Sequence, residues 1–309
     1  MKILITCPPM ISSKEHFLPL LKNLGYQVYC PIFEQTLSEN ELIKLIPKYD
    51  GWIIGDDPVS KAVLKAGKKG NLKAAVKWGV GTDNIDFNAC SELGISITNT
   101  PYMFGDEVAD LAISYLISLA RETYYIDRKI RDGLWPKNSG ISLKDKTLGI
   151  IGYGDIGKNL AKKAKIFGLN IIAYDPGIKK IEERMISLEN WPNNIEKCDF
   201  LTFTCALNEN NKYMFNNKII DMCKNNVRVI NVARGPLINE KDLCNGLKIG
   251  KIHSAALDVF ENEPISSSSF LLKHPLCILG SHNASNTIDA VLKTNEIVID
   301  KLHTFLNTH

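Results

Sequence analysis

The chain has 309 residues, a length that favours about two domains over one. Apolar residues make up 45% and charged residues 23%, which is typical of globular proteins, and such a chain can bury a large core without disulfides or metal ions. With 37 basic and 34 acidic residues the net charge is +3, which argues against a protein that binds nucleic acid or anionic membranes.

The cysteines and the N-terminal residues help to predict the cellular compartment of the protein. The eight cysteines are scattered and include no C-x-x-C pair, so we expect reduced thiols and neither a disulfide framework nor a metal site. The apolar stretch in the first ten residues is too short for the core of a signal peptide. No apolar run approaches the ~18 residues of a membrane helix. These features predict a soluble, cytoplasmic protein.

Short β-branched runs alternate with helical patterns in the first hundred residues. The expected strands are Ile3–Thr6, Gln27–Tyr29, Trp52–Ile54, Ala74–Lys77 and Ile95–Ile97. Helix signals lie between them as a capping box, a proline just inside a helix start and two terminating glycines, at Ser38 with Glu41, Pro58, Gly25 and Gly94. We expect Pro19 to interrupt a helix that begins at Ser12. This alternation predicts a parallel sheet covered on both faces.

A break at Asn99–Pro101 precedes a long helical pattern from Glu107 to about Arg131. Its length suits a helix that links domains or packs against a second subunit, and a long core helix is an equally good interpretation. A second alternation begins at Thr147. Its expected strands are Leu148–Ile151, Ile171–Tyr174, Phe200–Thr204, Arg228–Asn231, Ser254–Leu257 and Cys277–Leu279. The chain is therefore predicted to be α/β, with two doubly wound parallel-sheet domains.

A glycine-rich turn follows the first strand of this second half. Gly152 permits a tight turn, Gly154 allows the backbone to approach a pyrophosphate, and Gly157 allows close packing of helix on strand. Asp175 ends the next strand 18 residues after Gly157, about the spacing at which a carboxylate binds ribose hydroxyls. A plain βα turn can carry the same glycines, but the full context favours dinucleotide binding. Because the Asp175 carboxylate would repel a 2′-phosphate, we expect NAD rather than NADP.

Four segments together carry a family resemblance: residues 77–86 (KWGVGTDNID), 152–157 (GYGDIG), 231–237 (NVARGPL) and 255–264 (AALDVFENEP). The chain resembles the D-isomer-specific 2-hydroxyacid dehydrogenases, especially their phosphoglycerate dehydrogenase-like branch. The resemblance runs from Lys73 to Asn286, and the first 70 residues fit by pattern only. It implies a Rossmann cofactor domain, residues 101–284, inserted into a flavodoxin-like substrate domain formed by residues 1–100 and 285–309.

The resemblance also implies a catalytic set. Arg234 matches the family's arginine, whose forked donors hold the substrate carboxylate and polarise its carbonyl. His282 matches the acid–base histidine, and an imidazole suits this role because its ordinary pKa, ~6.5, lies near working pH. Glu263 matches the glutamate that pairs with the histidine and favours its protonated form. Glu261 is a competing carboxylate two residues early in the pattern.

Further roles follow from the same resemblance. Asp258 matches the residue that receives the nicotinamide carboxamide. The backbone amides around Val80 and Gly81 match a second group of donors that binds the substrate carboxylate. The other positions expected to contact NAD are Asp155, Ile156, Ala206 and Ala233. Two segments depart from the common pattern: residues 204–208 (TCALN) replace His-x-Pro-Leu-Thr, and residues 281–285 (SHNAS) replace Pro-His-x-Gly-Gly. Because of these two departures, the substrate of any one branch of the family cannot safely be assigned to this chain.

Lys77 bears on the substrate class. It stands where some phosphoglycerate-type members carry a basic residue, so it is a candidate for binding a second negative group of the substrate. A solvated lysine at a strand end is an equally good interpretation.

Together, the motifs and the resemblance predict an NAD-dependent enzyme that transfers hydride between nicotinamide and C2 of a D-2-hydroxy or 2-keto acid. Closure of the two domains would exclude water during the transfer. We also expect a homodimer formed through the cofactor domain. Three alternatives share the fold: a formate- or phosphite-type dehydrogenase, an NAD-sensing corepressor-like protein, and a nucleotide-binding protein without activity. The acid, the physiological direction, the pathway and the strictness for NAD stay open.

Overall fold

The computed structural model describes residues 1–308 and divides the chain into two compact units. Unit 1 combines Met1–Phe104 with the chain from Ser285 onward, and unit 2 is Gly105–Ala284. The sequence had placed these boundaries after residues 100 and 284. Each unit contains one sheet whose strands are all parallel, with helices in the connections. The predicted α/β class, with two doubly wound domains, is confirmed.

Unit 1 has a five-stranded sheet in the order β2-β1-β3-β4-β5, which is the flavodoxin-like order. Its strands are β1 (Lys2–Ile5), β2 (Gln27–Tyr29), β3 (Gly51–Ile54), β4 (Ala74–Lys77) and β5 (Ser96–Thr98). Its helices are α1 (Pro8–Ser12), α2 (Lys14–Asn23), α3 (Glu39–Leu45), the 3₁₀ helix η1 (Ile46–Lys48), α4 (Lys61–Lys69), α5 (Phe87–Leu93) and α11 (Ile288–Asn307). All five strands lie within two residues of their predicted positions.

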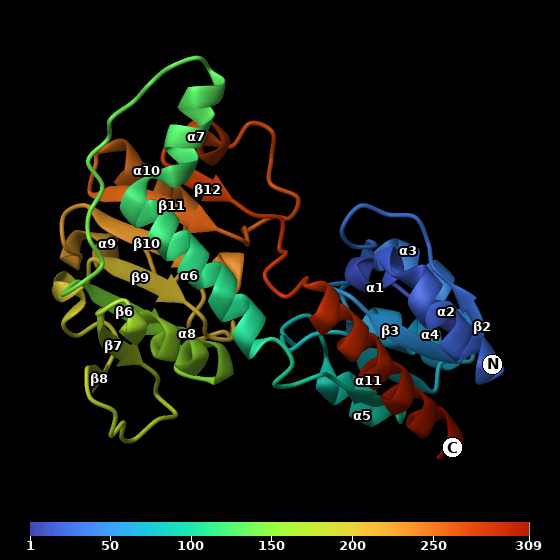
Figure 1. The fold of residues 1–309 in the computed structure, drawn as a ribbon. Helices are drawn as coiled ribbons and strands as arrows, with labels where there is room; N and C mark the ends of the chain where they lie inside the picture. The colour runs from blue at the N-terminus through green and yellow to red at the C-terminus, as the bar shows by residue number, and fades with distance from the viewer. Residues whose placement is uncertain (309) are drawn as a thin grey trace. The chain divides into compact units, whose positions relative to one another are not determined.

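The C-terminal helix α11 belongs to unit 1, where Figure 1 shows it in red beside the blue strands. It packs on β3 and β4. The indole N–H of Trp78 donates to Asn295 Oδ1 at 2.8 Å, and Asn295 Nδ2 donates to Ser13 Oγ at 2.9 Å. Because Trp78 and Asn295 are buried, this chain of hydrogen bonds satisfies polar groups that water cannot reach. Unit 1 is therefore completed by residues almost 300 positions from its start.

Two local predictions in unit 1 were wrong. The first helix breaks at Ser13, whose hydroxyl donates to the Met10 carbonyl, and α2 then continues through Pro19. Pro19 lies on the exposed face, where water can bind the carbonyl that its missing N–H leaves unpaired. Pro58 precedes a helix instead of starting one, because Ser60 caps α4 by accepting the Val63 N–H. The capping box at Ser38 and Glu41 and the left-handed Gly94 are confirmed.

Unit 2 has a seven-stranded sheet in the order β12-β11-β10-β9-β6-β7-β8, the Rossmann order with one further strand. Its strands are β6 (Thr147–Ile151), β7 (Asn170–Tyr174), β8 (Ile186–Glu189), β9 (Phe200–Phe203), β10 (Val227–Asn231), β11 (Ile252–Leu257) and β12 (Cys277–Leu279). Its α-helices are α6 (Gly105–Arg121), α7 (Thr123–Arg131), α8 (Asp155–Ile166), α9 (Asn217–Met222) and α10 (Glu240–Lys248). Short 3₁₀ helices are η2 (Ile195–Lys197), η3 (Gly235–Leu237) and η4 (Phe270–Lys273).

Two features of unit 2 differ from the sequence interpretation. Edge strand β8 was not predicted, because Ile186–Glu189 offers only a short alternation beside charged residues. The long helical pattern divides at Glu122, whose φ of 55° ends α6 and starts α7. Helix α6 has ten buried residues and packs on α8, β10 and β11, so it is a core helix of unit 2. No helix within residues 1–308 has the length and apolar character needed to cross a membrane.

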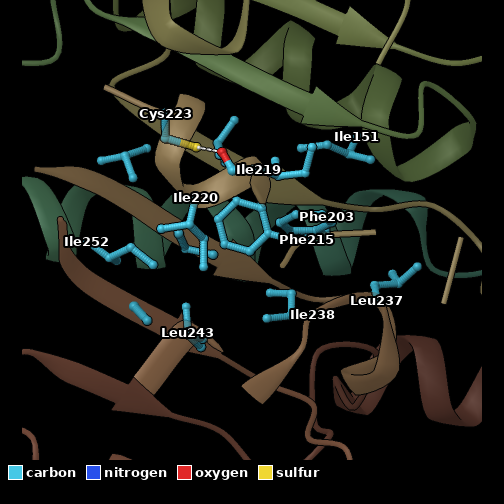
Figure 2. Packing of buried hydrophobic residues seen from close by; sticks show 14 of the residues in the cluster. Ile151, Phe203, Phe215, Ile219, Ile220, Cys223, Leu237, Ile238, Leu243 and Ile252 are labelled. Carbon is cyan, nitrogen blue, oxygen red and sulfur yellow. Dashed lines mark hydrogen bonds between the residues drawn. The ribbon is translucent and has the colours of Figure 1, made fainter. Parts of the chain in front are cut away.

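The core of unit 2 anchors the strands that carry the candidate site. Figure 2 shows Ile151 of β6 and Phe203 of β9 near Phe215 and the residues of α9. Phe203 and Phe215 meet edge to face, with ring centroids 5.5 Å apart. Cys223 is buried among them as a free thiol that donates to the Ile219 carbonyl. The close packing holds β6, β9 and β10 in register, so that their C-terminal ends meet at one edge of the sheet.

Candidate active site

The predicted site residues of unit 2 all follow C-terminal strand ends. The glycine turn follows β6, Asp175 follows β7, Ala206 follows β9, and Arg234 follows β10. Asp258 and Glu263 lie in the loop after β11, and His282 follows β12. Because the strands are parallel and adjacent, these loops share one edge of the sheet, which is where open α/β sheets bind ligands.

The glycine turn has the shape that a dinucleotide requires. Gly152 has a φ of +99°, and a Cβ added there would lie 2.5 Å from the Cys205 nitrogen. A Cβ on Gly157 would collide with the Gly152 carbonyl. The Thr204 hydroxyl lies 2.7 Å from the same carbonyl and donates to it, which fixes the turn against β9. This contact was not predicted, and it comes from one of the segments that depart from the family pattern.

The N-terminus of α8 is open toward solvent. Gly154, the helix N-cap, provides no side-chain cap, and a Cβ added to it would meet nothing within 4 Å. The first backbone N–H groups of this twelve-residue helix are therefore suited to phosphate oxygens. Asp155 Oδ1 accepts a hydrogen bond from Asn159, one turn along the same helix, at 3.3 Å.

Asp175 is fixed beside this turn. Its Oδ2 accepts the Tyr153 N–H and its Oδ1 accepts the Gly177 N–H, each at 2.8 Å. These two bonds hold the carboxylate at the end of β7, adjacent to the turn where the sequence predicted a ribose contact. The open helix end and the fixed carboxylate fit an NAD molecule.

Arg234 is held by a compact loop after β10. The side chain of Asn231 accepts the Ala233 N–H at 3.0 Å and donates to the Arg234 carbonyl at 2.8 Å. Gly235 then packs directly on the Phe260 backbone, and a Cβ at this position would collide with the Phe260 carbonyl. The arginine loop and the loop that carries Glu263 are thus in direct contact. The motif around Arg234 predicted the arginine itself but not the supporting role of Asn231.

The predicted His282–Glu263 pair is present. His282 Nδ1 and Glu263 Oε2 lie 2.7 Å apart, and Glu263 Oε1 accepts the Phe260 N–H at 3.0 Å. His282 has a φ of 56°, which is uncommon for a residue other than glycine, and its N–H donates to the Asp258 carbonyl at 2.7 Å. The competing Glu261 instead accepts the Glu240 N–H, so Glu263 is the partner of the histidine.

Asp258 is a buried carboxyl group with one unsatisfied oxygen. Its Oδ2 accepts the Ala284 N–H at 2.8 Å, and its Oδ1 has no hydrogen-bond partner within residues 1–308. Burial raises the pKa of Asp258, whereas the hydrogen bonds from the Asn283 and Ala284 amides oppose this shift. A buried acceptor without a donor fits the predicted contact with a carboxamide N–H.

Tyr115 of α6 lies beside Asp258 and was not predicted. A Cβ added to Gly280 would lie 2.7 Å from the Tyr115 hydroxyl and would collide with Asp258 Oδ1. Both oxygens therefore lie close to this glycine. Burial and the Asp258 charge raise the pKa of Tyr115. In the sequence, Tyr115 only continued the apolar face of a helix, which carries no signal of this contact.

The predicted substrate residues of unit 1 lie at the end of β4, where Lys77 is the last residue, and in the loop that follows it. Lys77 is buried, with 2% exposure, and its ammonium pairs with Asp56 at 2.7 Å and donates to the Gly55 carbonyl. The alternative of a solvated lysine was therefore wrong. Val80 is exposed, and its carbonyl accepts a hydrogen bond from Asn99 at 2.8 Å. Gly81 is partly exposed beside it.

Fold and site together define a Rossmann-type dinucleotide-binding protein with a paired histidine and glutamate. The family model of the D-isomer specific 2-hydroxyacid dehydrogenase, NAD binding domain, matches residues 113–284. Hydroxypyruvate reductase of Thermotoga maritima is 32% identical over 276 residues, which cover 88% of this chain and 89% of that protein. The chain belongs to the D-isomer-specific 2-hydroxyacid dehydrogenase family, as its motifs predicted, and NAD is its cofactor.

Other similar proteins include longer ones. D-3-phosphoglycerate dehydrogenase of Methanocaldococcus jannaschii is 35% identical over 308 residues, 97% of this chain but 56% of that protein. The chain thus spans about half the length of this relative. The crystal structure of a glyoxylate reductase from Paecilomyes thermophila has a TM-score of 0.82 at 27% identity, and the match covers 99% of this chain and 95% of that one.

Gly154 permits a test of the cofactor site that separates folding from binding. Because a Cβ at Gly154 meets no protein atom within 4 Å, Gly154→Ala should keep a thermal unfolding midpoint close to that of the unmodified protein. The methyl group would stand where the pyrophosphate approaches, so NADH affinity should fall at least about tenfold, equivalent to ~1.4 kcal/mol. Fluorescence titration with NADH and a thermal melt measure the two effects. Unchanged NADH affinity would contradict the predicted pyrophosphate position.

Proposed function

We propose that the protein is an NAD-dependent dehydrogenase that moves hydride between nicotinamide and C2 of a D-2-hydroxy acid or 2-keto acid. The 2.7 Å hydrogen bond between His282 and Glu263 is the observation that carries this proposal. It joins an acid–base group to a carboxylate at the sheet edge that also carries Arg234 and the glycine turn. Proton transfer, anion binding and cofactor binding are therefore grouped in unit 2.

The catalytic residues have separate tasks. The Arg234 guanidinium binds the substrate carboxylate and polarises the carbonyl oxygen that becomes the hydroxyl oxygen. His282 donates a proton to this oxygen during reduction and removes it during oxidation. Glu263 accepts the hydrogen on Nδ1 of His282, which assigns the proton exchange with substrate to Nε2. When bound, NAD supplies the hydride acceptor and NADH the hydride donor.

Several residues would hold the cofactor. The amides at the start of α8, around Gly154, Asp155 and Ile156, would bind the pyrophosphate, and Asp175 would accept hydrogen bonds from the ribose hydroxyls. Asp258 would accept the carboxamide N–H, and Ala206 and Ala233 would line the site. A fixed carboxylate at Asp175 disfavours a 2′-phosphate, so we propose a preference for NAD over NADP.

The direct test is NADH oxidation with a panel of 2-keto acids that includes hydroxypyruvate, glyoxylate, pyruvate and a phosphorylated acid, repeated with NADPH. His282→Ala should lower kcat by ~10²–10⁴ because general acid–base catalysis is lost. Arg234→Ala should mainly lower kcat/KM because the substrate loses its cation. Exposed His16 of α2 supplies the matched control, and His16→Ala should leave both constants unchanged.

The outcomes of this panel separate the candidate functions. If no acid is turned over but NAD is reduced in a separate assay with formate or phosphite, the chain would be assigned to the other chemistry that this fold supports. NADH binding without turnover of any acid would favour an NAD-sensing or inactive protein. Full activity in His282→Ala would refute the proposed proton transfer, and equal efficiency with NADPH would refute the role of Asp175.

The ion pair between Lys77 and Asp56 bears on substrate size and charge. We propose that Lys77, with the backbone at Val80 and Gly81, contributes to binding an acid with a second negative group. The Asp56 carboxylate, 2.7 Å away, offsets part of the lysine charge, so this group is bound less strongly than by an unpaired cation. Of the acids for which these relatives are named, phosphoglycerate carries a second negative group, whereas hydroxypyruvate and glyoxylate carry the carboxylate alone.

Two substitutions test this pair in opposite directions. Lys77→Ala should raise KM for a phosphorylated or dicarboxylic acid much more than for glyoxylate or pyruvate. Asp56→Asn keeps the cation and removes the opposing charge, so it should lower KM for the doubly charged acids. Steady-state kinetics on both groups of acids measure the effects. Equal changes for all acids would remove the second negative group from the proposal.

An exposed apolar surface in unit 2 supports the proposed homodimer. Helix α7 has no buried residue, and Leu134 and Trp135, directly after it, are 54% and 77% exposed. Such a surface is typical of an interface between subunits.

Trp135→Ser should convert the dimer to a monomer, as measured by light scattering after gel filtration. Ile249→Ser, at an exposed residue after α10, should leave the mass unchanged, and a monomeric unmodified protein would contradict the proposal. The cytoplasmic location stays a prediction from the sequence.

A further inference from the structure

Two glutamates 21 residues apart hold each other's backbone in unit 2. The Glu240 N–H donates to Glu261 Oε1 at 2.7 Å, and the Glu261 N–H donates to Glu240 Oε1 at 2.6 Å. Each carboxylate therefore accepts the other residue's main-chain hydrogen, which closes a ring of two charge-assisted hydrogen bonds. We call this pair the Glu240–Glu261 clasp.

The clasp joins a rigid element to the loop that carries the histidine's partner. Glu240 is the first residue of α10, and Glu261 lies two residues before Glu263. Glu263 in turn accepts the Phe260 N–H through Oε1 and contacts His282 Nδ1 through Oε2. The loop is thus anchored to α10 through Glu261 and stacked on Gly235 through Phe260.

We propose that Glu240 is a positioning residue for proton transfer, because the clasp places Glu263 against His282. This inference rests on the proposed function of His282 and Glu263 and extends it to a residue on a different element. The Asn239 side chain caps α10 by accepting the Asp242 N–H, and Glu261 accepts the N–H of Glu240, the first residue of the helix. The return hydrogen bond, from the Glu261 N–H to Glu240, satisfies no amide of α10 and is explained by the loop that it holds.

The charge of Glu240 gives the clasp a second effect. Burial raises the pKa of Glu240, the hydrogen bond from Glu261 opposes this, and the charges of Glu261 and Glu263 raise it further. The interaction is reciprocal, so an ionised Glu240 adds negative potential at Glu263 and stabilises a protonated His282. The neighbouring titratable groups include Cys244, which feels the charges of Glu240, Glu261 and Lys248, and Asp258, which feels those of His282 and Glu263.

Two substitutions separate position from charge. Glu240→Gln keeps an oxygen that accepts the Glu261 N–H but removes the charge, whereas Glu240→Ala removes both. Reduction requires protonated His282, so kcat/KM falls as pH rises through its titration, and loss of a nearby negative charge moves this fall to lower pH. Both variants should show a downward shift of a few tenths of a pH unit. Only Glu240→Ala should lose about tenfold or more in kcat/KM at its optimum.

The matched control is Asp242→Asn, two residues further along the same helix. Asp242 accepts the Asn217 N–H at 3.0 Å and therefore holds a different segment. This variant should keep the unmodified protein's pH profile and its kcat/KM. Should Glu240→Ala fail to fold, Glu261→Ala breaks the other half of the clasp and should cause the same loss.

An NMR titration of the His282 imidazole keeps this test independent of turnover. The resonance is assigned with His282→Ala, and its midpoint in the protein without substrate should fall in both Glu240 variants but not in Asp242→Asn. Unmodified kcat/KM and an unmodified midpoint in Glu240→Ala would overturn the clasp, as would equal losses of kcat/KM in both Glu240 variants. Inactivity of the unmodified protein on every acid would instead refute the proposed function, while the titration still decides on the clasp.

Discussion

The close approach of Gly235 to the backbone of Phe260 is the constraint on which the candidate site depends. Any side chain at residue 235 would collide with the Phe260 carbonyl, so only glycine lets the loops after β10 and β11 touch. Arg234 lies directly before this contact and Glu263 shortly after it. Anion binding and proton transfer thus share one backbone contact, and the parallel sheet below fixes both loops at the same edge.

Charge in this site is balanced locally. The chain as a whole is almost neutral, yet the loops after β10 and β11 and the start of α10 concentrate Glu240, Glu261 and Glu263 near His282. Each of these carboxylates accepts at least one backbone N–H. Hydrogen bonds from the main chain reduce the cost of holding like charges together, because they stabilise the charged oxygens without adding a cation. The Arg234 side chain is itself bonded to the main chain, since it donates to the Ala233 carbonyl at 2.8 Å.

Much of the fold and of the site follows from the sequence. Strand positions, the capping box at Ser38 and the glycine turn are local patterns, and each depends on residues a few positions apart. The pairing of Lys77 with Asp56, the Glu240–Glu261 clasp and the contact of Tyr115 with Asp258 join residues 21 to 143 positions apart. Spacing along the chain contains no information about such contacts, because they depend on how the strands are ordered. Strand β8 was missed for the opposite reason, since its four residues are too few to show a period.

The position of α11 has a consequence for the order in which the two units form during synthesis. Leu302 and Leu306 of this helix reach the neighbourhood of Gly51 in β3, so the face of β3 beneath them stays uncovered until the helix exists. All of unit 2 leaves the ribosome before α11 does, and its core is built from its own residues alone. Domains generally fold as units during translation. The cofactor unit therefore completes its fold first. Until α11 has been synthesised, one side of the sheet formed by the first hundred residues stays exposed.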